Sequence, residues 1–221
     1  MARLIHCESD VGMPSSSVPI TESVVYLVSD LVTRGQSLAQ TVASMGFRCK
    51  VFATLGEYRN ALVDREPGCL LFDGRTCVTA LNCAAPLEDG SPAPPVIFLT
   101  DDTDVSIVVR AMHGGAVDII LRRSFVEAEL WDALQTGMAR DAESRGAYAL
   151  RYERSRRLAM LSESEKEVLK LLVEGKNNRE IAERCGVTRA AVEGRRMRLM
   201  KKLGVKHFPA LVEFVVSVEF E

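Results

Sequence analysis

Acidic, hydroxyl and basic side chains follow the apolar runs in the first half of the chain, where they could do chemistry together. These residues are Asp30, Asp73, Thr100, Arg122 and Arg123. Carboxylates can hold Mg²⁺, which neutralises a phosphoryl donor and lets Asp73 act as a nucleophile. The hydroxyl and a cation could then bind the phosphoryl oxygens. The alternative is that these aspartates only begin loops.

The elements that would position these residues alternate along the chain. Strands are predicted over 24–28, 48–52, 69–72, 96–99 and 119–121, and helices over 31–45, 55–63, 106–112 and 126–139. This order predicts an α/β domain with a five-stranded, parallel, doubly wound sheet. The carboxyl ends of its strands meet at one edge, where ligands gather. The proline-rich loop Pro86–Pro95 leaves little room for a third helix before the fourth strand.

A second group of residues, in the last third of the chain, has the spacing of helix starts and ends. Residues that cap a helix start stand at Ser162, Asn177 and Thr188, and Glu follows three positions after the first two. Gly175 and Gly186 suit the left-handed position after a helix. Two helices joined by a short, glycine-containing turn make a helix-turn-helix, a DNA-binding unit.

The predicted third helix, 189–202, has two different faces. At about 100° per residue, Val192, Leu199 and Leu203 share the face that we expect in the core. The other face carries Arg189, Ala190, Glu193, Gly194 and Met197. A recognition helix meets base edges with such small or polar residues near its N-terminal end. The basic residues of this helix, expected to neutralise phosphates, are Arg195, Arg196, Arg198, Lys201 and Lys202.

Charge divides the chain in the same way. Residues 1–137 hold 10 Lys and Arg against 17 Asp and Glu, whereas residues 138–221 hold 18 against 13. The first part therefore carries a net charge of −7 and the second +5. A basic segment is typical of phosphate-backbone binding, although both segments can equally be solvated surfaces.

These patterns predict a mobile tail over 1–22, an α/β domain over 23–137, a helical linker over 138–160 and an all-α, four-helix helix-turn-helix domain over 161–221. No apolar run approaches the roughly 18–20 residues that span a bilayer, and the N-terminus lacks the apolar core of a signal peptide. We therefore expect a cytoplasmic protein without membrane contact. The six cysteines have no spacing that suits zinc, so we expect them to be reduced.

The segment 161–218 resembles the LuxR-type helix-turn-helix through Leu161–Leu169, Gly175–Ala182 and Val192 with Leu199–Val205. The resemblance implies that the third helix enters the major groove and that a fourth helix, 208–218, carries the dimer contact. The implied base contacts are Arg189, Ala190, Glu193 and Gly194. The implied phosphate contacts are Asn178, Thr188 and Arg196. The implied dimer contacts are Phe208, Leu211, Val212 and Val215.

The first domain resembles a response-regulator receiver, and the whole chain resembles FixJ-like regulators. The local matches are Ala111–Ile120, Val25–Asp30 and Cys69–Asp73. The resemblance implies that Asp73 is the phosphoacceptor and a Mg²⁺ ligand. It further implies that Asp30 is a second Mg²⁺ ligand and that Thr100 is the switch hydroxyl. Mg²⁺ is the only cofactor that we expect.

Four positions depart from the receiver pattern. Ser29 stands where one of two acids is usual, Gly74 where Met-Pro follows the acceptor, and Arg122 where Lys-Pro follows the fifth strand. Ile119 replaces the switch aromatic. Arginine is larger and planar, so it does not simply substitute for lysine. Phosphorylation by a histidine kinase and independence of phosphorylation therefore both stay open.

We expect a transcription regulator, not an enzyme, because none of the three histidines sits in a nucleophile–base arrangement. Its expected partners are double-stranded DNA with a pseudo-palindromic operator, RNA polymerase, a sensor histidine kinase and a second copy of the chain. The receiver would control dimerisation or exposure of the DNA-binding face. The alternative is a phosphorylation-independent adaptor that acts through protein–protein contacts.

Overall fold

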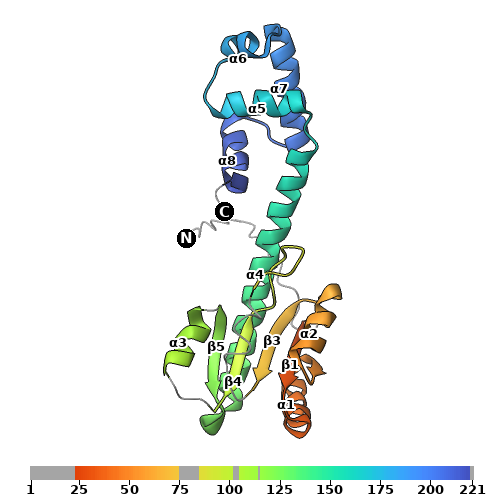
Figure 1. The fold of residues 1–221 in the computed structure, drawn as a ribbon, viewed down its shortest axis with the longest axis vertical. Coiled ribbons are helices and arrows are strands. Elements are labelled where there is room, and N and C mark those ends of the chain that lie inside the picture. Colours follow the sequence, from red (N-terminus) through yellow and green to blue (C-terminus); the bar gives the residue numbers. More distant parts are fainter. Residues whose placement is uncertain (1–22, 75–84, 102–104, 114, 220–221) are drawn as a thin grey trace, which may run out of the picture. The chain divides into compact units, whose positions relative to one another are not determined.

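The computed structural model describes residues 23–74, 85–101, 105–113 and 115–219. The chain divides into two compact units, Met1–Ser144 and Arg145–Glu221 (Figure 1). The division falls inside the segment 138–160 that the sequence predicts as a linker. The predicted tail 1–22 lies outside the described residues.

The first unit is built on a five-stranded sheet of parallel strands in the order β2-β1-β3-β4-β5. The strands are β1 (Val24–Ser29), β2 (Arg48–Phe52), β3 (Gly68–Asp73), β4 (Val96–Thr100) and β5 (Ala116–Leu121). The predicted doubly wound α/β fold is confirmed. The fifth strand starts at Ala116, three residues before the prediction, because Ala116 and Val117 are also buried against the sheet's helices.

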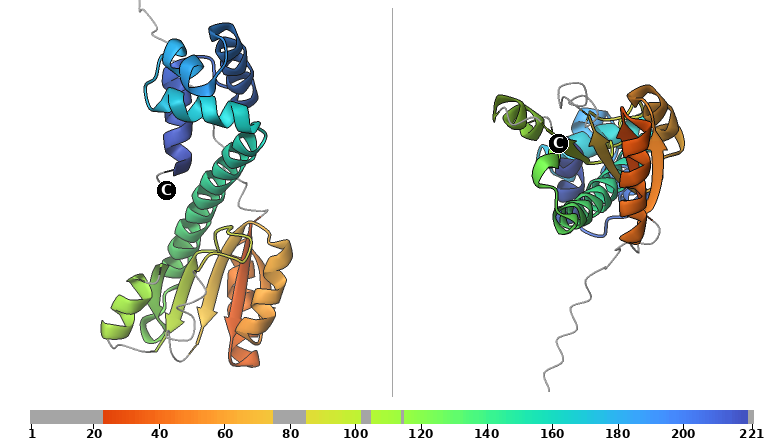
Figure 2. Two further views of the ribbon diagram at one scale, coloured as in Figure 1. Left: turned by 45° about the horizontal axis from the view of Figure 1, so that its top comes forward. Right: turned by 90° about the horizontal axis from the view of Figure 1, so that it is seen from below.

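Helices cover both faces of the sheet, as the two further views show (Figure 2). The helices are α1 (Val32–Ser44), α2 (Leu55–Ala61), α3 (Val105–His113) and α4 (Glu127–Ala159), with short 3-10 turns η2 (Leu62–Asp64) and η4 (Arg122–Ser124). Side chains of α1 and α4 pack on one face. Side chains of α2 and α3 pack on the other face.

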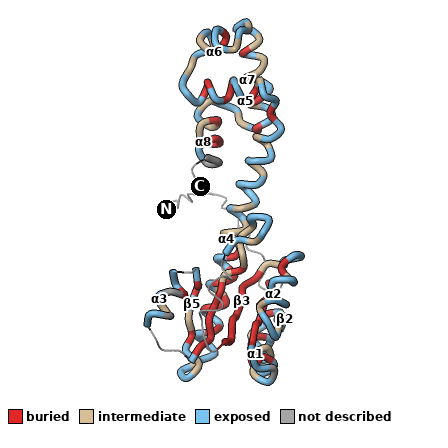
Figure 3. Tube along the Cα trace, in the orientation of Figure 1, coloured by how far each residue is buried: buried red, intermediate tan, exposed pale blue. Residues whose placement is uncertain are grey.

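The central strands β1, β3 and β4 are buried along their whole length (Figure 3). Successive side chains of a strand point to opposite faces. In β1, Val25 and Leu27 therefore join the α1/α4 layer, while Val24 and Tyr26 join the α2/α3 layer. This double burial explains why the strands appear in the sequence as continuous apolar runs.

One continuous helix, α4, covers both the predicted last helix of the first domain and the helical linker, which the sequence predicts to continue that helix. Its 33 residues run through the division between the two units. Its buried positions all lie in the first unit and follow helical spacing: Leu130, Ala133, Leu134, Gly137, Met138 and Asp141. Gly137 lets α4 approach the sheet closely, since a Cβ added there would lie 3.0 Å from the Cβ of Cys69.

The second unit is all helical beyond α4. Its helices are α5 (Glu163–Val173), α6 (Asn178–Cys185), α7 (Arg189–Leu203) and α8 (Phe208–Glu219). Apolar side chains from all four helices share one core, which includes Val168, Ile181, Leu199 and Leu211. Over the described ranges, no helix is both long enough and apolar enough to cross a bilayer.

Candidate functional sites

The first candidate site lies at the carboxyl ends of the strands, around Asp73. This residue ends β3, and its side chain is only 1% exposed. The strand register pairs it with Ser29, the last residue of β1. The Ser29 hydroxyl donates a hydrogen bond to Oδ2 of Asp73 over 2.7 Å. A donor thus stands where the receiver pattern has a second acid.

Arg122 holds the other oxygen of the same carboxylate. Its guanidinium forms ion pairs with Asp73 and with Asp101. It also donates a hydrogen bond to the carbonyl of Leu99 over 3.2 Å. Because these partners end or follow β3 and β4, and Arg122 itself directly follows β5, one side chain ties three strand ends together.

Arg34 of α1 completes this cluster. Its Nη2 lies 2.9 Å from Oδ1 of Asp30, and its Nε lies 3.6 Å from Oδ2 of Asp73. Arg34 is not among the site residues predicted from the sequence. A usable signal existed, since Arg34 stands four residues after Asp30, the spacing at which opposite charges meet on a helix.

Thr100 occupies the last position of β4, at the same sheet edge, and is 1% exposed. It lies opposite Leu121 in the β4–β5 ladder. Ile119, which stands where receivers have an aromatic, lies opposite Phe98 and is half-buried. Thr100 is thus buried at the edge of the sheet. Its partner on β5 is the aliphatic Leu121, next to Ile120.

The residues at this edge do not fit a Mg²⁺ ion in the arrangement shown. Mg²⁺ requires oxygen ligands in octahedral geometry, whereas a guanidinium has only hydrogen-bond donors. Both oxygens of Asp73 are engaged, and Asp30 pairs with Arg34. Among the described residues, no three His, Cys, Asp or Glu side chains gather as a metal site. In this arrangement the two expected ligands, Asp30 and Asp73, are both engaged in ion pairs with arginines.

The second candidate site is the helix-turn-helix. Ser162 and Asn177 form complete capping boxes with Glu165 and Glu180. Thr188 caps α7 by accepting a hydrogen bond from the backbone N–H of Ala191. Gly186 ends α6 in the left-handed region at φ 64°. These caps fix the angle between α6 and α7 and so define where α7 begins.

The two predicted faces of α7 are present. Val192, Leu199 and Leu203 are fully buried. The residues predicted to face DNA are exposed or half-buried: Asn178, Thr188, Arg189, Ala190, Glu193, Gly194 and Arg196. Met197 is 73% exposed, which is high for a large apolar residue. Its position seven residues after Ala190 places it on the same face, one turn beyond Glu193.

The basic residues of α7 divide into two sets. Lys202 donates a hydrogen bond to Glu165 over 2.7 Å, and Arg198 lies 3.7 Å from the same carboxylate. The Lys202 ammonium and the backbone N–H of Ser162 lower the pKa of Glu165 to about 2. Arg198 and Lys202 are thus tied to α5. Among the described residues of α7, Arg195, Arg196 and Lys201 have no such ion pair with Glu165, so they are the stronger candidates for phosphate contacts.

Arg196 lies against the start of α8. Its guanidinium carbon is 5.9 Å from the centre of the Phe208 ring, within the range of a cation–π contact. Phe208 also packs against the helical core. The contact orients Arg196 while leaving its nitrogens able to donate to an anion.

Burial argues against two of the four expected dimer contacts in α8, Leu211 and Val215, and leaves Phe208 and Val212 as predictions. Leu211 and Val215 are 0% and 5% exposed, because they belong to the apolar core of the helical unit. Side chains so buried cannot form a contact between two folded copies. Val212 is half-buried, and Val216, one turn further, is 43% exposed. Among the residues of α8 whose exposure is described, these two valines are apolar and remain at the surface, as does the half-buried Phe208.

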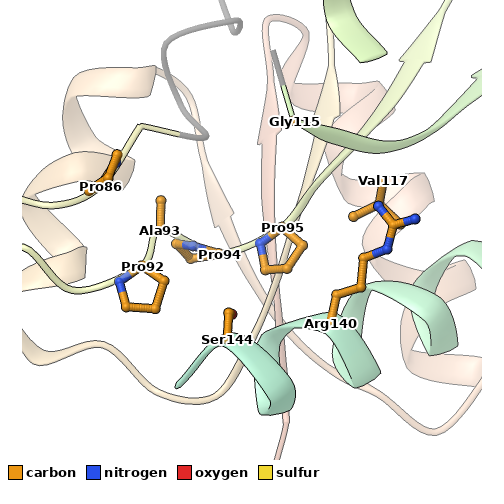
Figure 4. Close-up of a pocket in the computed structure, with 9 residues that line it drawn as sticks. All are labelled: Pro86, Pro92, Ala93, Pro94, Pro95, Gly115, Val117, Arg140 and Ser144. Atoms are coloured by element: carbon orange, nitrogen blue, oxygen red, sulfur yellow. The ribbon is translucent and has the colours of Figure 1, made fainter. Parts of the chain in front are cut away.

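A shallow cavity of about 260 Å³ lies at the opposite end of the sheet from Asp73. Four prolines and Ala93 of the segment 86–95 line one side, and Arg140 and Ser144 of α4 line another (Figure 4). Gly115 and Val117 complete the lining. Its walls are largely apolar, and none of the predicted phosphorylation, metal-binding or DNA-binding residues lines it.

Comparison with known proteins covers both units of the chain. Residues 159–215 match the family described as bacterial regulatory proteins, luxR family. The chain is 30% identical over 193 residues to the transcriptional regulatory protein FixJ of Azorhizobium caulinodans, covering 87% of this chain and 91% of that protein. It is 29% identical over 193 residues to nodulation protein W of Bradyrhizobium diazoefficiens, covering 87% and 85%.

A solved structure supports the same assignment. The response regulator StyR superposes with a TM-score of 0.70 at 28% identity, over 88% of this chain and 98% of that one. Both the α/β unit and the helical unit fall within these long matches. The chain belongs to the FixJ-like family of response regulators, in which a receiver domain is joined to a LuxR-type helix-turn-helix.

Proposed function

We propose that this protein is a transcription regulator that binds double-stranded DNA through α7. The observation that carries the proposal is the exposed N-terminal face of α7, with Arg189, Ala190 and Glu193 all solvent-accessible on a helix whose opposite face is fully buried. The family to which the chain belongs supports the same function.

The side chains on this face suit base recognition. Arginine can donate two hydrogen bonds to guanine, and glutamate can accept one from cytosine. Arg189 and Glu193 have these roles in our proposal, while Ala190 and Gly194 let the helix backbone approach the bases. Met197 lies on the same face and suits contact with a thymine methyl.

Phosphate contacts come from residues around this face. Asn178 and Thr188 lie near the N-termini of α6 and α7, where backbone N–H groups also favour an anion. Arg196 lies above Phe208 and would donate to a phosphate oxygen. Two copies, paired through α8, would place two α7 helices on a pseudo-palindromic operator and present the bound protein to RNA polymerase.

The receiver would control dimerisation or exposure of α7. A sensor histidine kinase is its partner if Asp73 accepts a phosphoryl group. The pairing of Asp73 with Arg122 and Ser29 favours the alternative, a receiver that acts without phosphotransfer, because the guanidinium neutralises the carboxylate and occupies the side from which a phosphoryl donor would approach with Mg²⁺. Mass spectrometry after incubation with acetyl phosphate and Mg²⁺ tests this. One added phosphate, absent from Asp73→Asn, would contradict the phosphorylation-independent mechanism.

DNA binding is tested with a pool of randomised duplexes, followed by fluorescence anisotropy on the selected sequence. We expect an affinity that falls steeply as salt rises. Arg189→Ala should weaken binding by about 1–3 kcal/mol and relax the choice of one base pair. Lys166→Ala, which removes a charge from the exposed side of α5, is the control and should change little. Absence of any salt-sensitive duplex binding would rule out the proposal in favour of the adaptor function.

A further inference from the structure

The sheet edge around Asp73 holds charges of both signs in close contact. Three carboxylates, those of Asp30, Asp73 and Asp101, meet two guanidiniums, those of Arg34 and Arg122. The side chain of Asp73 is 1% exposed. That of Arg122 is 18% exposed and reaches Asp73 from the turn that follows the fifth strand. The cluster thus supplies its own cations to a buried anion.

A guanidinium is permanently charged in proteins and has no lone pair for a metal. A divalent cation at Asp73 would face two such positive groups within the same contact distance, and charges of like sign repel strongly in a partly buried site. The hydroxyl of Ser29 donates a hydrogen bond to Oδ2 of Asp73 and so makes this oxygen a weaker ligand for a metal ion. The two guanidiniums and the hydrogen bond from Ser29 therefore both disfavour a metal ion at Asp73.

We propose that Arg34 and Arg122 take the place of a divalent cation at this site, so that the receiver domain binds no Mg²⁺. The ends of β3, β4 and β5 are then held together by ion pairs, and not by a metal that exchanges with solvent. Arg122 lies in η4, five residues before α4 begins. The proposal is independent of DNA binding, and only the metal measurements below test it.

The test is a titration of the full-length protein with Mn²⁺ as a probe for Mg²⁺, followed by electron paramagnetic resonance of the free ion. Wild type should show no Asp73-dependent site. The variant Arg34→Gln/Arg122→Gln keeps side chains of hydrogen-bonding character without charge and should bind Mn²⁺ at least roughly tenfold more tightly. Asp73→Asn in that background should abolish the gain. Arg123→Gln, one residue along the chain, is the matched control and should behave as wild type.

Two results would overturn the proposal. One is a Mn²⁺ site in wild type that Asp73→Asn removes. The other is a folded double variant, with the far-ultraviolet circular dichroism of wild type, that gains no affinity for Mn²⁺. If the double variant does not fold, thermal denaturation of wild type decides the question. A rise in melting temperature with Mg²⁺, at constant ionic strength and absent from Asp73→Asn, contradicts the proposal, and its absence supports it.

Discussion

The carboxylate of Asp141 in α4 accepts a hydrogen bond from the backbone N–H of Gly68, at the start of β3, over 2.9 Å. The same carboxylate forms an ion pair with Arg65, and these two side chains are only 1% and 8% exposed. Arg65 also donates a hydrogen bond to the carbonyl of Pro92. Asp141 is the last buried residue of α4, so this contact fixes where the helix leaves the sheet.

Removing one partner of this buried pair should be costly. Asp141→Ala leaves Arg65 buried without its counter-charge, and we expect the free energy of unfolding to fall by about 3–5 kcal/mol. Urea denaturation followed by fluorescence of Trp131, the only tryptophan of the chain, measures the loss in this unit. Replacing both partners by apolar residues, Arg65→Met with Asp141→Leu, should cost less.

An exposed pair in the same helix provides the control. Glu153 lies 3.0 Å from Arg157, and both side chains are more than a third exposed. Glu153→Ala should lower the free energy of unfolding by no more than about 1 kcal/mol. Equal losses for Asp141→Ala and Glu153→Ala would show that burial does not govern the strength of these pairs.

Two glycines of α4 should respond oppositely to the same change. A Cβ at Gly146 meets no atom within 4 Å, so Gly146→Ala should stabilise the helix by about 1 kcal/mol. A Cβ at Gly137 would lie 3.0 Å from Cβ and 3.3 Å from Sγ of Cys69. Gly137→Ala should therefore be less stable than Gly146→Ala by about 1–3 kcal/mol. Differential scanning calorimetry of the two variants measures this difference, and a stabilising Gly137→Ala would argue against close packing of α4 on β3.

The helix-turn-helix could be predicted in detail because its signals are local. Caps at Ser162, Asn177 and Thr188 depend on residues at most three positions away. The two faces of α7 follow from the period of one helix. The strands could be predicted equally well, because burial on both faces produces uninterrupted apolar runs in β1 and β3.

The pairing of charges could not be predicted because it depends on tertiary contacts. The sequence predicts that Arg122 and Asp73 lie at one edge of the sheet, but not that they pair directly across 49 positions. It gives no sign that Lys202 pairs with Glu165 across 37 positions. The burial of Leu211 was missed for a related reason. An apolar residue on α8 can pack in the core of its own domain or at an interface with a partner. Only the tertiary structure shows which of the two it does.

Stability of the helical unit should depend on pH through Glu165. Its pKa, lowered to about 2 mainly by Lys202, lies below the unfolded value of about 4.5. A depressed carboxyl pKa stabilises the fold above the unfolded pKa, and this contribution is lost as pH falls from about 4.5 towards 2. Glu165→Gln should remove about 1–2 kcal/mol at neutral pH and flatten this part of the profile.

Urea denaturation by circular dichroism between pH 7 and pH 3 would measure that profile. Lys202→Met, which removes the main cause of the lowered pKa, should likewise reduce the slope. Glu163→Gln is a suitable control, because Glu163 is 89% exposed and begins the same helix. An unchanged slope in Glu165→Gln would mean that other carboxylates dominate the acid response.

Buried and exposed residues of α8 should have different effects on folding and on self-association. Leu211 is completely buried, so Leu211→Ala should lower the free energy of unfolding by about 2–5 kcal/mol. Val216 is 43% exposed, and Val216→Glu should change that free energy by less than about 0.5 kcal/mol. If α8 pairs two copies on DNA, Val216→Glu introduces like charges at the contact and should weaken the pair.

Sedimentation of the protein with a selected operator duplex distinguishes these effects. Wild type should form a complex of two copies per duplex, whereas Val216→Glu should form mainly a complex of one copy. Lys206→Glu, which reverses a charge on the exposed loop before α8, controls for the added negative charge near DNA. If Val216→Glu retained the two-copy complex at wild-type affinity, pairing would not use the outward side of α8. Since Leu211 and Val215 are occupied in the core, the contact would then have to use residues other than these two and Val216.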